Sequence, residues 1–325
     1  METGAKTDNL IPEWQYPDFY FINLMSVMNQ SKVGFGKGYR LCLQSHVTCT
    51  KSNSSINIMS YLLVLLAVSL AVSALGWIYF IYFFSIGYGF GVSALAVTLA
   101  LLFRDALTVP TAVLCAVMFV FGCRLGLYLL TREKRSIEYK KILYGPDAAK
   151  KKPLFVVIMV WLFCALLYVG QVSPVAFYLA NKAAGAPVSE VLPWVGAALM
   201  ACGVVLEAAA DAQKKAAKKI NKNRFVDTGL YKIVRCPNYL GELVIWTGAF
   251  VVGFGACMTV WQWVIAIIGY LGIVYVMFSG ARRLELRQNK VYGEDPEYQA
   301  YIKKTPILLP LVPLYSVAKY EWLEA

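Results

Sequence analysis

Long apolar segments constrain this chain more than any other feature. An α-helix needs about 20 apolar residues to cross the hydrocarbon core of a bilayer. The chain is 59% hydrophobic and only 15% charged, whereas about 25% of residues in soluble domains are charged. We therefore predict an all-α, polytopic transmembrane helix bundle of about seven spans, at residues 59–84, 86–103, 108–130, 154–180, 191–211, 238–256 and 259–279.

These spans set the expected domain organisation. Residues 1–58 would form a polar N-terminal segment, 59–315 the transmembrane domain and 316–325 a tail. We place the cofactor-binding half of the domain at about 191–315. The stretch 292–306 has charge pairs typical of a helix, so we expect a short helical tail there.

Basic residues predict the topology. Of the 31 Lys and Arg residues, 22 fall in the stretches 132–152, 214–235 and 282–304, each beside an apolar span. Cytosolic loops carry such an excess, and a count of seven spans puts all three stretches on one side. We expect a cytosolic C-terminus and a non-cytosolic N-terminus, in the endoplasmic reticulum of a eukaryote or the inner membrane of a bacterium. The net charge of +12 therefore indicates a lipid bilayer as partner and no nucleic acid.

The end of the fifth span carries a helical face of charged residues. Glu207, Asp211, Lys215 and Lys218 recur at i, i+4, i+8 and i+11, which places them on one side of a helix. Ordinary ion pairs at a helix end would give the same pattern. Glu207, however, lies where hydrocarbon should still surround it, and ionisable residues at that depth usually face a bundle interior.

The segment from Arg224 to Trp246 is the strongest candidate for a site. Its polar residues surround a proline at the predicted start of a helix, where free N–H groups favour an anion. Arginine can add charge-assisted hydrogen bonds to phosphate. In the structural alternative, Arg235 is an interfacial anchor and Glu242 its buried partner. The candidate residues are Arg224, Gly229, Arg235, Asn238, Tyr239 and Glu242.

Arg124 needs a partner because it lies about seven residues inside the third predicted span. The acids on the same side are Glu207, Asp211 and Glu242, and a structural ion pair is as consistent with the pattern as a ligand contact.

No Ser/His/Asp set is present, since the one histidine, His46, is in the N-terminal segment. With Cys42 and Cys49 it offers only three ligands, so we predict no metal site.

The chain resembles the steroid 5-alpha-reductase superfamily, in particular its uncharacterised steroid-reductase-like membrane proteins. Three stretches carry the resemblance, which covers roughly 120–315. They are RLGLYLLTR at 124–132, DTGLYKIVRCPNYLGELVIW at 227–246 and YGEDPEYQAYIKKTPILLP at 292–310. It implies a seven-helix bundle that binds NADPH on the cytosolic side. It also implies hydride transfer to a carbon–carbon double bond of a steroid or another lipid-like enone, a hydrophobic small molecule.

The resemblance also implies roles for individual residues. It places Asp211, Lys218, Arg224, Asn238, Tyr239 and Glu242 at the cofactor, where we add Gly229 and Arg235 from the segment described above. Our own assignments, which the resemblance does not supply, put Arg124 at the substrate and Tyr88, Tyr128 and Glu242 in catalysis. The chain departs from the family in two places. The stretch FFSIGYGFG at 83–91 lacks the family's early carboxylate, and 281–290 lacks a His and Tyr pair.

Two other functions remain open. Isoprenylcysteine carboxyl methyltransferases, which use S-adenosylmethionine, have a related bundle and an Arg-His-Pro-x-Tyr motif. This chain has Cys236 where they have histidine. A non-catalytic lipid- or sterol-binding membrane protein is the other alternative, because the family's proton-donating acid is missing.

Overall fold

The computed structural model describes residues 54–135, 152–256 and 258–323. Contacts divide the chain into Met1–Cys49 and Thr50–Ala325, and all described residues belong to the second unit. The predicted N-terminal segment, with Cys42, His46 and Cys49, lies almost wholly outside the described residues, as does most of the basic stretch 132–152.

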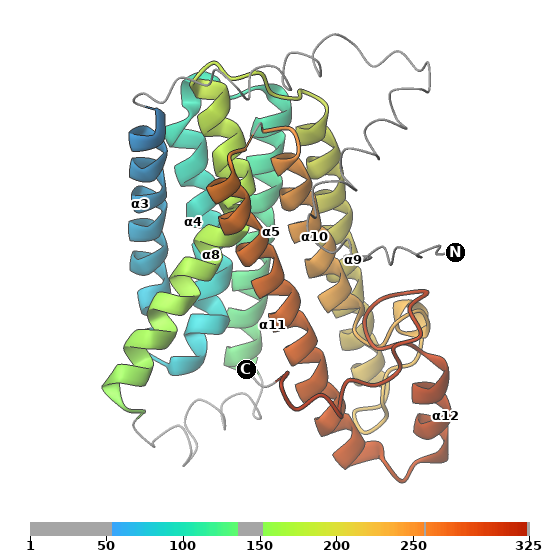
Figure 1. The fold of residues 1–325 in the computed structure, drawn as a ribbon. Helices are drawn as coiled ribbons and strands as arrows, with labels where there is room; N and C mark the ends of the chain where they lie inside the picture. The colour runs from blue at the N-terminus through green and yellow to red at the C-terminus, as the bar shows by residue number, and fades with distance from the viewer. Residues whose placement is uncertain (1–53, 136–151, 257, 324–325) are drawn as a thin grey trace, which may run out of the picture. The chain divides into compact units, whose positions relative to one another are not determined.

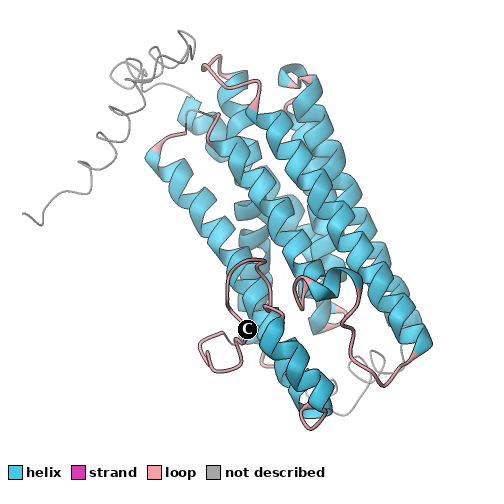
Figure 2. Cartoon of the chain, turned by 90° about the vertical axis from the view of Figure 1, so that its right-hand side faces the viewer, coloured by secondary structure: helices cyan, strands magenta, loops and turns pink. Residues whose placement is uncertain are grey.

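The described part of the chain is a helix bundle without strands (Figures 1 and 2). Five helical segments are long and apolar enough to cross a membrane, at Ile58–Trp77, Val109–Arg132, Leu154–Ala183, Leu192–Ile220 and Val260–Tyr292. Two shorter helices, α4 and α10, lie among them. The protein is therefore an integral membrane protein. Its long helices are α3 (Ser54–Ser73), α4 (Ile86–Leu102), α5 (Val109–Arg135), α8 (Leu154–Ala183), α9 (Leu192–Ile220), α10 (Pro237–Gly253) and α11 (Val260–Tyr292).

The first predicted span is interrupted. The α-helix ends at Ser73, and the 3₁₀ helices Ala74–Trp77 and Phe80–Phe84 follow. The chain turns back sharply enough that the ring of Phe83 occupies the space a side chain at Gly76 would need. The Tyr168 hydroxyl of α8 donates to the Phe83 carbonyl. This turn delivers the start of α4 to the bundle interior.

Helices α9 and α11 run past their predicted ends at 211 and 279, to Ile220 and Tyr292. Their last turns are rich in Ala, Lys, Arg and Glu, which sustain a helix in water as well as in lipid. The short α12 (Pro296–Lys304) follows, with Tyr298 buried on its inner face. The chain after α12 then returns to the bundle, where Ile307 and Leu308 are buried. The helical tail was correctly predicted.

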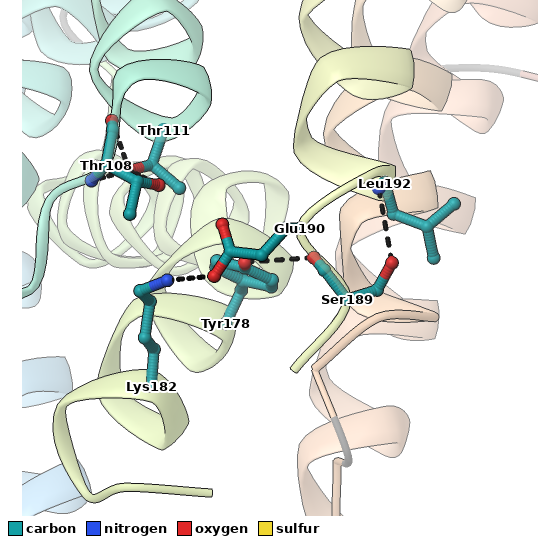
Figure 3. A network of polar contacts seen from close by, with 7 residues as sticks. All are labelled: Thr108, Thr111, Tyr178, Lys182, Ser189, Glu190 and Leu192. Atoms are coloured by element: carbon teal, nitrogen blue, oxygen red, sulfur yellow. Dashed lines mark hydrogen bonds and ion pairs between the residues drawn. The ribbon is translucent and has the colours of Figure 1, made fainter. Parts of the chain in front are cut away.

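The two ends of the bundle differ in chemistry. The basic loop 221–236, α12 and the start of α8 lie at one end (Figure 1). At the other end, a loop between α8 and α9 is held by neutral and ion-pair contacts (Figure 3). There the Lys182 ammonium pairs with Glu190, and the Tyr178 hydroxyl donates to the Ser189 carbonyl at 3.0 Å.

Candidate functional site

Arg124 on α5 meets two carboxylates of α9. Its Nη1 lies 2.9 Å from Glu207 Oε1, and its Nη2 donates to Asp211 Oδ2 at 2.7 Å. The two acids are one helical turn apart, so both reach the same guanidinium. Arg124 is therefore paired as predicted, with two of its three candidate acids. Glu207 is 4% exposed, which confirms that it faces the bundle interior.

A second buried cluster joins α4 to α10. The Tyr88 hydroxyl donates to Glu242 Oε1 at 2.6 Å, and Trp246 Nε1 donates to the Tyr88 oxygen at 2.8 Å. Glu242 and Trp246 lie four residues apart, so the acid and the indole flank the phenol from one helix face. All three side chains are buried. The Tyr168 ring packs against the Tyr88 ring, with 5.1 Å between the ring centroids.

Close packing of α9 and α10 brings these clusters together. A Cβ atom on Gly241 would lie 2.8 Å from Glu207 N, and one on Gly203 would lie 2.6 Å from Gly241 O. Only glycine permits backbones to approach this closely. Glu207 thus packs against the residue that precedes Glu242, and the two carboxylates belong to one interior site.

Lys218 and Arg224 form a separate group at the basic end. The Lys218 ammonium donates to Arg224 O at 2.6 Å and to the Tyr292 hydroxyl at 3.0 Å. Arg224 pairs with Asp227 at 3.0 Å and with Glu297. These acids raise the pKa of the Arg224 guanidinium. Arg224 also lines a surface hollow of about 360 Å³ that extends from Gln213 to Gly229.

Gly229, one of the predicted site residues, lies in a turn. Its φ of +59° is the left-handed conformation that glycine adopts without strain. Gln213 Oε1 of α9 accepts from Leu230 N at 2.8 Å and fills the space that a Cβ would need. The turn therefore holds the basic loop against α9.

Arg235 pairs with Glu285 of α11 at 2.8 Å, and each side chain is 1% exposed. Its Nη2 also donates to Tyr315 O, while its Nε and Nη1 have no partner among the described residues. The alternative in which Glu242 is the partner of Arg235 is therefore wrong. Glu285 was not among the predicted site residues, although an acid in an otherwise basic stretch of α11 was a usable signal.

The remaining predicted residues lie between these groups. Asn238 and Tyr239 are half-buried in the first turn of α10, and the Tyr239 ring packs near Gly280. Tyr128 is half-buried one turn beyond Arg124. At the N-cap of α10, burial raises the pKa of the Cys236 thiol to about 12, so this position cannot act as the base that a histidine would provide.

Comparison with known families gives one match. The model of a family described as a protein of unknown function (DUF1295) matches residues 83–305, which is more than half of the chain. No curated protein and no solved structure matches it. The matched region runs from the turn at Phe83 to the end of α12, so it contains both interior clusters.

Proposed function

The chain belongs to the DUF1295 family, and we propose that it is a membrane-embedded, NADPH-dependent reductase of the steroid 5-alpha-reductase type. Its reaction would transfer a hydride to a carbon–carbon double bond of a steroid or another lipid-like enone. The observation that carries the proposal is the 2.6 Å hydrogen bond between Tyr88 and Glu242. It joins a phenol and a carboxylate from distant parts of the chain, and it supplies an acid in place of the one missing from 83–91.

The Tyr88 cluster has the properties of a proton donor. A phenol is a general acid when a neighbouring group sets its orientation and can return its proton. Trp246 fixes the phenol oxygen and Glu242 accepts its hydrogen. Because all three are buried, the proton would not be lost to bulk water. Tyr128, near Arg124, is the second candidate donor.

The predicted cofactor residues include hydrogen-bond donors that could bind the phosphates of NADPH. Arg235 keeps two buried nitrogens without a partner among the described residues, and Arg224 lines the hollow at the basic end. These two arginines are close in sequence to Lys218, Gly229, Asn238 and Tyr239. The carboxylates of Asp211 and Glu242 would orient polar groups of the cofactor. NADPH supplies the hydride when it is bound. The basic end would then face the cytosol, where NADPH is available.

Binding preference tests the proposal against its alternatives. We expect the purified protein to bind NADPH more tightly than S-adenosylmethionine in isothermal titration calorimetry. The reverse order would replace the reductase with a methyltransferase. Binding of neither, together with binding of a sterol, would favour the non-catalytic alternative.

The substitution Glu242→Gln tests the role of the hydrogen bond between Tyr88 and Glu242. The substitution keeps the shape of the side chain but removes its ability to return a proton, so NADPH oxidation with an enone substrate should fall at least tenfold. Glu190→Gln, at the opposite end of the bundle, is the matched control and should retain full activity. Equal activity of the Glu242 variant and the wild type would refute the catalytic role.

A further inference from the structure

The interior site holds three carboxylates close together. Arg124 contacts Glu207 and Asp211, and it acts electrostatically on Glu242 as well. Asp211 also has the Lys214 ammonium one turn away on α9, and the two interact electrostatically. The Arg132 guanidinium of α5 acts on Asp211 as well. Lys214 and Arg132 therefore act on Asp211, whereas Arg124 is the cation beside both Glu207 and Glu242.

Glu207 is only partly paired. One of its oxygens contacts Arg124, but Oε2 is buried and has no partner among the described residues. Arg124 cannot turn fully to Glu207, because its Nη2 is committed to Asp211 at 2.7 Å. A buried carboxylate oxygen without a donor is costly, and in proteins such a group usually takes up a proton instead.

Glu242 has the same difficulty. It is 7% exposed, and the donors beside it are neutral, namely the Tyr88 phenol and the Trp246 indole. The contact of Gly203 with Gly241 holds Glu207 beside it. Two carboxylates in one buried site repel each other when both are ionised, so the pair retains a proton that an isolated carboxylate would release.

We propose that Glu207 and Glu242 share one proton at neutral pH and together form a buried proton-binding site. A metal ion fits less well, because no group of three or more ligating side chains that could hold one occurs in the described ranges. The charged and titratable groups around the pair come from every helix packed against it. They are Tyr88 of α4, Arg124, Tyr128 and Arg132 of α5, Tyr168 of α8, Asp211 and Lys214 of α9, Tyr239 of α10, and, further out, Arg283 and Arg287 of α11.

The site would also give Glu207 a role in the proposed reduction, and this part rests on the proposed function. Saturating the double bond adds one hydride to one carbon and one proton to its neighbour. The proton leaves Tyr88 as its O–H bond breaks, and Glu242 returns one across the 2.6 Å hydrogen bond. The carboxyl pair then regains its proton from the basic end. Glu207 is thus a positioning residue that keeps a proton available to Glu242.

Infrared spectroscopy of the purified protein tests the proton site without cofactor or substrate. We expect the absorption of a protonated carboxyl at pH 7, which disappears at alkaline pH. Glu207→Gln and Glu242→Gln should each abolish it, because the remaining acid can then ionise beside Arg124. Glu190→Gln is the control and should leave it unchanged.

The outcomes separate the two proposals. A wild-type protein without this absorption at pH 7 overturns the proton site, even if it reduces enones and even if a variant fails to fold. An absorption that survives in both Gln variants also overturns it, because another carboxyl must then carry the proton. A protein that shows the absorption but reduces no enone keeps the proton site and loses the reductase.

Discussion

At the scale of single residues, Gln171 of α8 is the buried polar group that the bundle leaves least satisfied. It is 4% exposed, and neither amide atom has a partner in the described part of the chain. Its neighbour Gly170 packs on Gly269 of α11, and Tyr168, one turn earlier, packs on Tyr88. Gln171 therefore points into the interior between these contacts. An unsatisfied buried amide costs about 1–3 kcal/mol.

Replacing this amide should stabilise the protein. We expect Gln171→Leu to raise the midpoint of thermal unfolding in detergent, because the variant removes that cost and fills the same space. The matched control is Gln262→Leu. Gln262 is 1% exposed, but its Oε1 accepts from Thr259 N at 2.8 Å, so its loss should lower the midpoint. A lower midpoint for both variants would show that Gln171 has a partner.

Cys236 should resist alkylation. The thiolate is the reactive form of cysteine, and burial raises the pKa of this thiol to about 12. At pH 8 the thiol therefore stays neutral as well as inaccessible. Peptide mapping after treatment with N-ethylmaleimide should find Cys236 unmodified in the folded protein and modified after unfolding in SDS. Rapid labelling of the folded protein would contradict the buried position.

At the scale of helices, the contact between α9 and α10 holds the interior site together. A Cβ on Gly241 would lie 2.8 Å from Glu207 N, so Gly241→Ala should force the helices apart and lower the unfolding midpoint. Gly91→Ala is the control. A Cβ there would meet the Tyr168 ring at 3.5 Å, an ordinary contact, so it should change stability little. Equal effects would show that the helix contact is not tight.

The sequence predicted the existence of the helices better than their ends. An apolar run indicates membrane depth but not helix type, so the 3₁₀ turns after Ser73 could not be foreseen. They depend on Phe83 packing over Gly76, a contact set by the tertiary fold. The ends of α9 and α11 were placed too early because their charged last turns were interpreted as loop and tail.

The same distinction applies to the site. The partners of Arg124 could be predicted because few acids lie at its depth, and two of those three contact it. The partner of Arg235 could not, because Glu285 is brought to it by the packing of α11 and the tail. Tyr88 was chosen among 21 tyrosines with little support from the sequence, and its contact with Glu242 emerges only from the packing of α4 on α10.

At the scale of the whole described unit, one buried ion pair connects the basic end of the bundle to the C-terminal tail. Glu285 accepts from Arg235 through Oε1 and from Val317 N at 2.8 Å through Oε2. Arg235 donates to Tyr315 O as well. The backbone N–H of Arg235 also donates to Pro306 O at 2.9 Å. The C-terminal tail is thus held by Arg235, two residues before the start of α10.

This arrangement predicts that the tail and the basic end loosen together. Glu285→Gln leaves Arg235 charged, buried and unpaired, a loss that typically costs about 3–5 kcal/mol. Trypsin should then cut at the exposed Lys319 faster than in the wild type, and NADPH affinity should fall if Arg235 holds a phosphate. Glu294→Gln, at an exposed position beyond α11, is the control and should change neither rate nor affinity. Faster cleavage with unchanged affinity would limit Arg235 to fastening the tail, and an unchanged cleavage rate would mean that other contacts fasten it.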